Sequence, residues 1–324
     1  MAAEPEVVLW GPIVERIRCP RCGRGVTTVP VGVRCESGHH YILRSGYLDF
    51  SSEALAAGTT EQTFSSFGYE WNAFDDIRDE DEAFAAIYFS DLDLPALAGK
   101  VGLDAGCGKG RFTRILARHL GGIVALDGSQ AVEAAARNLG DLDNVVVVRS
   151  DLRSAPFAPE SFDFISSLGV LHHLDDPRQG FRRLLEYLAP GGRLLLYLYS
   201  RPETTDVRAV ALTLASLVRK VTVGLPHPVL KVLSEPIAAL LYGAVVLPGR
   251  WGQRRGISAL DALPMSTYRD KPFRSLVLDT FDRLSAPVEH RYVWAELEPW
   301  FAEAGLVVDA ARDQTGWFIT AHRA

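Results

Sequence analysis

The chain has 324 residues, of which 48% are hydrophobic and 23% charged, and its formal net charge is −6 at pH 7. This length can bury a sizeable core, and the composition is ordinary for a soluble globular protein. Acidic and basic residues are mixed along the chain without a basic run. This argues against a nucleic-acid partner, because phosphate binding normally requires a basic patch.

The first residues, MAAEPEVVLWGP, carry acids and prolines where a signal peptide would carry a basic and then an apolar segment. We therefore expect a cytoplasmic protein. In that reducing compartment, clustered cysteines are more often metal ligands than disulfide partners.

Residues 1–52 contain such a cluster. Two cysteines are separated by two residues, a third follows after twelve more, and a histidine comes four positions beyond it: Cys19, Cys22, Cys35 and His39. Three thiolates and an imidazole form a closed tetrahedral set for zinc, and a closed set is structural because no position stays open for chemistry. We predict a zinc-ribbon-like domain here, with His40 as the alternative fourth ligand.

Residues 53–97 are predicted to form a helical lid. Their segment TFSSFGYEWNAFDD is dense in aromatic residues, and Phe67, Tyr69 and Trp71 alternate along it. It resembles the amino-terminal lid of several small-molecule methyltransferases, whose aromatic side chains close over the cofactor. The resemblance implies that Tyr69 and Trp71 bind the cofactor and that Glu70 meets its methionine ammonium group. Ordinary packing of a helix on the core is the alternative.

The stretch LDAGCGKGRFTRIL places glycines at the turn between a short buried strand and a helix. Such turns bind nucleotide-like ligands beyond the carboxyl ends of parallel strands. A dinucleotide fingerprint requires G-x-G-x-x-G, whereas here Gly106, Gly108 and Gly110 alternate. An acidic residue followed by alternating glycines resembles the first motif of the class I methyltransferases that use S-adenosylmethionine.

The next elements follow in the order of that family. A second strand ends at Asp127, a third ends at Ser150 and Asp151, and a fourth spans residues 162–168. A fifth strand follows a Pro-Gly-Gly turn, and AGLVVDAARDQTGWFITAHR predicts a closing hairpin. The resemblance implies an α/β, Rossmann-like fold with a seven-stranded, mostly parallel sheet and a C-terminal antiparallel hairpin, formed by residues 98–201 and 288–324.

The resemblance also implies a cofactor site. In the family, the carboxylate after the second strand holds the ribose hydroxyls, and a carboxylate suits this task because it accepts two hydrogen bonds from vicinal hydroxyls. The acid of the SDL element meets the adenine amino group. With the two lid aromatics, the candidate cofactor-binding residues are Asp104, Gly106, Gly108, Gly110, Asp127, Gly128, Ser150, Asp151, Leu152 and Leu168.

Methyl transfer from a sulfonium is an in-line displacement, so the protein mainly positions the acceptor, excludes water and removes a proton from a hydroxyl or amine. His172 and His173 follow the fourth strand and are the candidate bases, because an unperturbed imidazole titrates near pH ~6.5. A structural role for both is the alternative. Tyr199, on the fifth strand, is a further candidate on the acceptor side.

Residues 202–287 form a long insert, which must have structure of its own. Its longest apolar stretch, PIAALLYGAVVLP, is bounded by prolines and is shorter than the ~20 residues of a spanning helix, so we expect a buried or interfacial helix. We predict a helical cap that roofs an apolar acceptor pocket, rests on a membrane surface or forms a homodimer interface. At the end of the insert and just after it, Asp279, Asp282, Arg283 and His290 are polar candidates for the acceptor side.

The sequence as a whole predicts a cytoplasmic S-adenosylmethionine-dependent methyltransferase with structural zinc and a small-molecule or lipid-like acceptor, methylated on oxygen, nitrogen or carbon. One alternative is an rRNA or tRNA base methyltransferase, because the cysteine spacing followed by SGYLDF is similar to the RNA-gripping zinc segment of bacterial rRNA guanine-N1 methyltransferases. The acidic balance and the apolar insert depart from that pattern. A second alternative is a non-catalytic cofactor-binding scaffold whose ribbon docks a partner protein.

Overall fold

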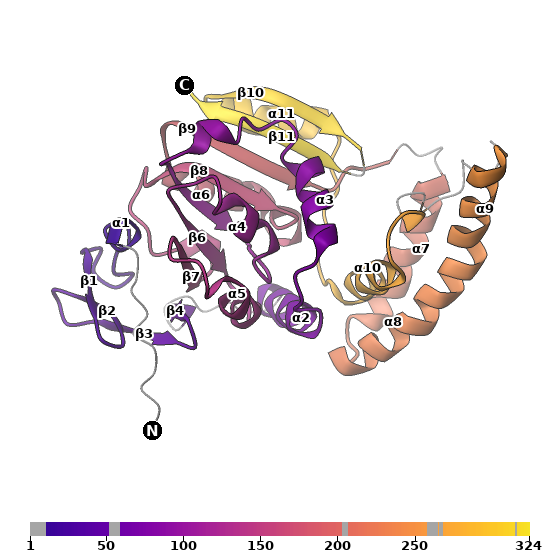
Figure 1. Ribbon diagram of the computed structural model, residues 1–324, viewed down its shortest axis with the longest axis horizontal. Coiled ribbons are helices and arrows are strands. Elements are labelled where there is room, and N and C mark those ends of the chain that lie inside the picture. Colours follow the sequence, from indigo (N-terminus) through magenta and orange to yellow (C-terminus); the bar gives the residue numbers. More distant parts are fainter. Residues whose placement is uncertain (1–10, 52–58, 203–206, 258–264, 266–267, 315) are drawn as a thin grey trace. The chain divides into compact units, whose positions relative to one another are not determined.

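The computed structural model describes residues 11–51, 59–202, 207–257, 265, 268–314 and 316–324 (Figure 1). The chain divides into two compact units. The first comprises Met1–Ser200 and Val288–Ala324, and the second is Arg201–Pro287.

The first unit is built on a sheet in which seven strands lie in the order β7, β6, β5, β8, β9, β11 and β10. Their bounds are β5 Val101–Ala105, β6 Gly122–Asp127, β7 Val145–Arg149, β8 Phe162–Leu168, β9 Leu188–Leu198, β10 Leu306–Asp313 and β11 Trp317–Arg323. Strands β5 to β9 pair in parallel, whereas β11 is antiparallel to both of its neighbours. This order confirms the predicted class I methyltransferase fold.

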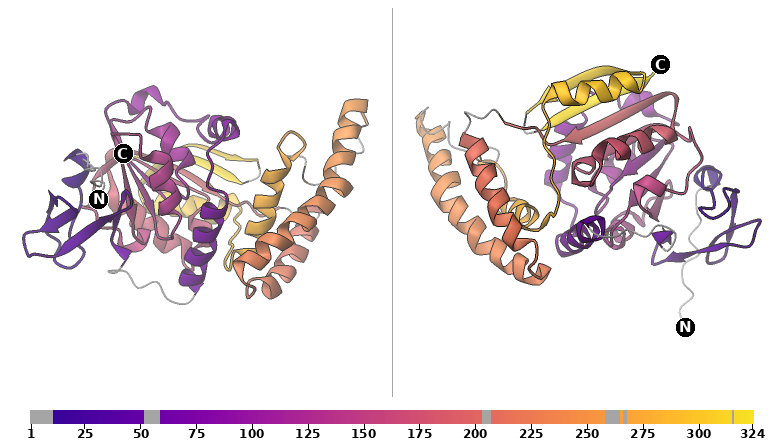
Figure 2. Two further views of the ribbon diagram at one scale, coloured as in Figure 1. Left: turned by 60° about the horizontal axis from the view of Figure 1, so that its bottom comes forward. Right: turned by 180° about the vertical axis from the view of Figure 1, so that it is seen from behind.

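Helices cover both faces of this sheet, as parallel strands require. Helices α3 (Asp79–Tyr88), α4 (Arg111–Leu116) and α5 (Val132–Leu139) lie on one face, and α6 (Pro177–Tyr187) and α11 (Trp294–Glu303) lie on the other (Figure 2). The sequence specifies where α6 begins. Asp176 caps it by accepting a hydrogen bond from the Gln179 amide, and Pro177 occupies its first turn.

The cysteine-rich segment is continuous with this sheet. Its strands are β1 (Val26–Val29), β2 (Gly32–Cys35), β3 (His40–Arg44) and β4 (Tyr47–Asp49). Strand β4 pairs in parallel with β7, so that the whole sheet has 11 strands. Helix α1 (Gly11–Val14) contacts β6, and Ile13 and Ile17 are fully buried. A domain boundary is predicted at residue 52, but the strands before and after this residue belong to one continuous sheet.

The predicted lid is helical where it is described. Helix α2 spans Thr59–Ala73, α3 follows it, and a short 3₁₀ helix, η2, spans Pro95–Leu97 before β5. Two contacts hold α2 against the loops at the carboxyl ends of the strands: the Thr60 hydroxyl donates to Asp175 at 2.8 Å, and the Asn72 amide donates to the Gln130 carbonyl at 2.8 Å.

The second unit is helical. It contains α7 (Val207–Thr222), α8 (His227–Leu241), the π-helical turn η5 (Tyr242–Val246), α9 (Leu247–Arg255) and α10 (Phe273–Ser285). Helix α10 packs on α7 and α8, and Asp279 of α10 accepts a hydrogen bond from the Tyr268 hydroxyl.

The expectation that the two prolines limit the apolar helix to less than a membrane-spanning length is wrong. Pro236 lies inside α8 and Pro248 lies in the first turn of α9, and the helical run continues from His227 to Arg255. A proline lacks an amide donor and crowds the preceding turn. At Pro248 the π-helical turn η5 provides the local change of helix geometry that accommodates it.

Candidate functional site

A cavity of about 100 Å³ lies where β5, β6, β7 and β8 end. Three parts of the first unit line it: side chains of α2, the glycine loop with the start of α4, and the residues that follow the strands. Most of the predicted cofactor-binding residues are among them, namely Trp71, Gly106, Gly108, Asp127, Gly128, Ser150, Asp151, Leu152 and Leu168. They come together because the carboxyl ends of parallel strands meet at one edge of a sheet.

The glycine loop needs its glycines for two reasons. Gly106 and Gly108 have φ angles of +87° and +54°, a left-handed conformation that side chains disfavour. Space is also short, since a Cβ atom at position 106 would lie 2.2 Å from a methyl group of Val170, and one at position 108 would lie 3.0 Å from the Trp71 indole nitrogen. Positions 106 and 108 therefore accept glycine and leave no space for a larger side chain.

Gly110 has a different role from the one predicted. It is the N-cap of α4 with a φ angle of +83°, and a Cβ atom there would lie 2.7 Å from the Leu139 side chain. It lies outside the cavity lining. The absence of a side chain at Gly110 therefore permits close packing of α4 against α5.

Asp127 connects the first two strands at the cavity. One carboxylate oxygen accepts a hydrogen bond from the Gly108 amide at 2.9 Å, and the other accepts from the amide and hydroxyl of Ser129 at 2.8 and 2.7 Å. These bonds fix the orientation of the carboxylate, and its oxygens retain lone pairs that can accept from vicinal hydroxyls.

Asp151 also lines the cavity, but it has a partner in its own chain. The Arg153 side chain donates to both carboxylate oxygens, with its Nε atom 3.0 Å from Oδ1 and 3.1 Å from Oδ2. Asp151 additionally accepts from the Arg153 amide at 2.9 Å. The aspartate is therefore held rigidly at the cavity wall.

Asp104 lies outside the cavity lining, contrary to its predicted cofactor contact. Its side chain is buried and accepts hydrogen bonds from the hydroxyls of Thr113 at 2.5 Å and Ser166 at 2.9 Å. Burial raises its pKa to about 6 despite these donors. Asp104 thus links β5, α4 and β8 beneath the glycine loop, and its contribution to the site is structural support.

The lid contributes aromatic side chains to the cavity through one face of α2. Phe64, Phe67 and Trp71 line it, whereas Tyr69 and the buried Glu70 do not. The prediction for Tyr69 used the alternation of positions 67, 69 and 71, but this segment is a helix. In a helix, residues three or four apart share a face and residues two apart do not. The helical period would have identified Phe64, which the sequence analysis missed.

These aromatic side chains occupy much of the space at the strand ends. A Cβ atom on Gly128 would lie 2.4 Å from the Phe64 ring, and Trp71 covers Gly108. Ligand pockets usually have volumes of roughly 300 to 1,000 Å³, well above the cavity described here. Admission of a nucleoside-sized ligand therefore requires the α2 side chains to move.

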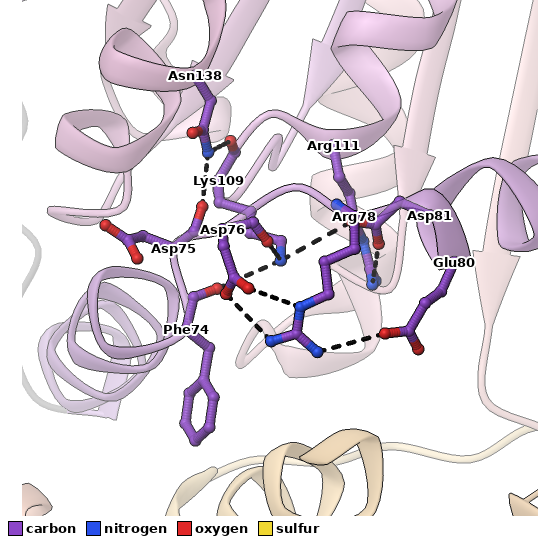
Figure 3. A network of polar contacts seen from close by, with 9 residues as sticks. All are labelled: Phe74, Asp75, Asp76, Arg78, Glu80, Asp81, Lys109, Arg111 and Asn138. Carbon is purple, nitrogen blue, oxygen red and sulfur yellow. Dashed lines mark hydrogen bonds and ion pairs between the residues drawn. The ribbon is translucent and has the colours of Figure 1, made fainter. Parts of the chain in front are cut away.

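Lys109, inside the glycine loop, joins the loop to the lid (Figure 3). Its buried ammonium donates to the backbone carbonyls of Phe74 at 3.2 Å and Asp76 at 2.5 Å, and Asp81 lies at 4.0 Å. Burial lowers the pKa of Lys109, so these contacts offset a desolvation penalty. The Asn138 amide adds bonds to the Asp75 and Lys109 carbonyls at 2.8 and 2.9 Å. The turn between α2 and α3 is thereby fastened to the loop.

The two histidines after β8 have different surroundings. His173 lines the cavity, and its Nδ1 atom lies 2.7 Å from the Val288 carbonyl oxygen. Because a carbonyl only accepts, Nδ1 carries the proton and Nε2 of the neutral ring is left as an acceptor. The Phe67 ring packs against the same imidazole at 4.8 Å.

His172 is fully buried and lies outside the cavity lining. Neither ring nitrogen has a hydrogen-bond partner among the described residues, and burial lowers its pKa well below the usual range. Its ring stacks on Tyr199 at 3.9 Å, and the Arg291 guanidinium covers the Tyr199 ring at 4.8 Å. His172 and Tyr199, both predicted as catalytic, form a packed layer behind the cavity. The His290 amide donates to the His172 carbonyl in this layer.

The predicted metal ligands lie close together in the cysteine-rich segment that contains strands β1 to β4, away from this cavity. The Sγ atoms of Cys19, Cys22 and Cys35 and a ring nitrogen of His39 all lie within 4.8 Å of one another. His39 Nδ1 is 3.3 Å from the Cys19 sulfur and 3.4 Å from the Cys35 sulfur, and the Cys22 and Cys35 sulfurs are 3.7 Å apart. Zinc–sulfur bonds of about 2.3 Å imply sulfur separations of about 3.8 Å across a tetrahedron. The four donors therefore fit zinc, with His39 and not His40 as the fourth.

One protein family model matches part of this chain. Residues 103–196 match the family model described as "Methyltransferase domain". Together with the strand order, this match defines a class I S-adenosylmethionine-dependent methyltransferase domain in this part of the chain.

Two curated relatives show how far the likeness extends. The 2-phytyl-1,4-naphtoquinone methyltransferase of Thermosynechococcus vestitus is 36% identical over 118 residues, which are 35% of this chain and 52% of that protein. The demethylmenaquinone methyltransferase of Clavibacter sepedonicus is 34% identical over 113 residues, which are 35% and 46% of the two chains. The chain thus matches about half the length of these relatives.

A solved S-adenosylmethionine-dependent methyltransferase from Mesorhizobium loti is also similar, with a TM-score of 0.45 and 17% identity over 75% of this chain and 100% of that one.

The Lys109 contacts yield a testable expectation. Lys109→Met keeps the length of the side chain and removes its hydrogen bonds to the lid. We expect hydrogen exchange of the backbone amides of residues 70–81 to become at least tenfold faster, because the turn after α2 loses its attachment. Arg118→Ala is the matched control, because the Arg118–Glu82 ion pair also joins the lid to the turn after α4 but is about half exposed on both sides. Equal exchange in Lys109→Met and the native chain would contradict this role.

Proposed function

We propose that this protein transfers a methyl group from S-adenosylmethionine to a small, lipid-like acceptor, in the first instance a quinone-type ring. The observation that carries the proposal is the cavity at the ends of β5 to β8, where the bare glycine loop, Asp127 and Asp151 meet inside a methyltransferase domain. The named activities of the two quinone methyltransferases described above support the acceptor class.

The residues present fit the cofactor. The backbone at Gly106 and Gly108 leaves room for close approach, Asp127 offers an oriented carboxylate to vicinal hydroxyls, and residues 150–152 follow β7 where an adenine would be recognised. S-adenosylmethionine supplies a methyl group on a sulfonium, which an acceptor atom displaces in line. The aromatic side chains of α2 would exclude water from that reaction once the lid has closed.

His173 is the proposed general base. Its Nδ1–H is oriented by the Val288 carbonyl, so its Nε2 can take a proton from an acceptor hydroxyl at the cavity. Removal of that proton makes a quinol ring more nucleophilic at oxygen and at the ring carbons. His172 and Tyr199 would fix the position of His173 from behind, because the two imidazole rings pack at 4.3 Å.

We further propose that the ribbon binds one structural zinc ion. The matching separations of the four donors support it, and the N–H of Arg24 and the Ser37 side chain lower the pKa of Cys22 to about 6, which favours the thiolate that a metal requires. Since β4 is part of the main sheet, a folded ribbon also covers the edge of β7.

Calorimetric titration with S-adenosylhomocysteine tests the cofactor site. We expect micromolar binding by the native chain and at least tenfold weaker binding by Asp127→Ala, because the hydrogen bonds to the ribose are lost. Asp141→Ala, which removes an exposed carboxylate paired with Arg114, is the control and should bind normally. Absence of binding to folded native protein would refute the proposed function.

The assignment of the base is tested by turnover with a naphthoquinol acceptor. His173→Gln should lower kcat by about 10²- to 10⁴-fold while changing the affinity for S-adenosylhomocysteine less than threefold. His172→Phe should retain at least a third of the native kcat, because the buried ring acts by packing and has no hydrogen bond to lose. The opposite ranking of the two variants would assign the base to His172.

Metal analysis tests the ribbon. We expect one zinc per chain, its loss in Cys22→Ser and His39→Ala, and its retention in His40→Ala and Cys107→Ala. Cys107 is a buried thiol outside the cluster and serves as the matched cysteine control. Folded native protein without zinc would refute the metal site.

A further inference from the structure

The second unit exposes an apolar face along α8 and α9. Apart from the adjacent pair Val232 and Leu233, the exposed apolar side chains recur at intervals of three, four and seven residues, which places them on one side of the helical run: Val229, Val232, Leu233, Ile237, Leu240, Leu247 and Trp251. The opposite side is buried, with Leu230, Ser234 and Ala238 fully covered where α10 packs on α8. One side of this run therefore belongs to the core of the unit and the other is apolar surface.

Some apolar side chains of this face are more exposed to solvent than buried. Leu240 is 71% exposed and Val232 is 69% exposed, and in α7 Val221 is 76% exposed. Single exposed apolar residues are common on soluble proteins, but a continuous apolar surface usually marks an interaction site. Among the described residues, the run His227–Arg255 also has the length and composition of a helix that could cross a membrane, since it contains an 18-residue window with a mean hydropathy of 1.7.

The charge of the same unit differs from that of the chain. Residues 201–287 contain 12 Lys and Arg against 7 Asp and Glu, whereas the whole chain has a net charge of −6. Exposed basic side chains end the helices that carry the apolar surface, with Lys220 at the end of α7 and Arg254 and Arg255 at the end of α9. Arg255 lies over the exposed Trp251 ring at 5.0 Å. An indole and guanidinium groups beside an apolar stripe suit the headgroup region of a bilayer.

We propose that this face binds peripherally to the surface of an anionic lipid bilayer. Peripheral binding fits better than insertion across the bilayer, because the other side of α8 is packed within its own unit and the run carries Lys231, Glu235 and Arg250. A lipid surface fits better than a second copy, because a self-paired face would bring basic helix ends of like charge together.

Vesicle co-sedimentation tests the proposal with the full chain and without cofactor or acceptor. We expect at least tenfold stronger binding to phosphatidylcholine vesicles that contain phosphatidylglycerol than to pure phosphatidylcholine, with a decrease at high salt. Val232→Glu/Leu240→Glu should weaken binding at least tenfold, since it places charges on the apolar face. Arg254→Glu/Arg255→Glu should remove most of the preference for the anionic lipid.

The matched control is Val31→Glu, which introduces the same charge at a 53% exposed valine of the ribbon and should leave binding unchanged. Circular dichroism confirms that each variant is folded. Failure of the native chain to bind either vesicle at low salt would overturn the proposal. A dimer in light scattering that Val232→Glu/Leu240→Glu dissociates, without vesicle binding, would overturn it in favour of a second copy. Because cofactor binding is measured separately, neither result affects the test of the proposed methyl transfer.

Discussion

The hydrogen bond from the Gly108 amide to the Asp127 carboxylate is the contact on which the site depends. It joins the loop after β5 to the end of β6, and so fixes the separation of two neighbouring strand ends. It exists because parallel strands deliver their carboxyl ends to one edge and because Gly108 adopts the positive φ angle of this turn. The other elements of the cavity are arranged around this pair.

The lid is fastened to the same loop by groups that sequence motifs do not mark. The Lys109 ammonium donates to the carbonyls of the turn after α2, and the Trp71 ring covers Gly108. The loop is therefore in contact both with the cavity and with the helix that closes it. A ligand that displaced Trp71 or Phe64 would act directly on α2, because both side chains belong to that helix and line the cavity.

The buried polar groups below and behind the cavity act as a rigid support. Asp104 is enclosed between the hydroxyls of Thr113 and Ser166, and His172 packs against the rings of Tyr199 and His173. In both cases burial keeps the group away from ligand and solvent. His173 lines the cavity and its neighbour His172 does not, because the turn after β8 points the two side chains in different directions.

The sequence by itself determined where the strands of the domain occur along the chain, the glycine turn, the acid that ends β6, the acid that follows β7, and the four grouped metal-ligand candidates. These depend on local patterns: apolar strand runs, glycines that permit positive φ angles, and ligand spacing within a short segment. Only the tertiary structure decided which side chains share a surface. Tyr69 turns away because α2 has a helical period, Asp104 is enclosed by two distant hydroxyls, and the apolar run passes through its prolines. These outcomes depend on helix phase and on contacts between segments remote in sequence, which no local pattern specifies.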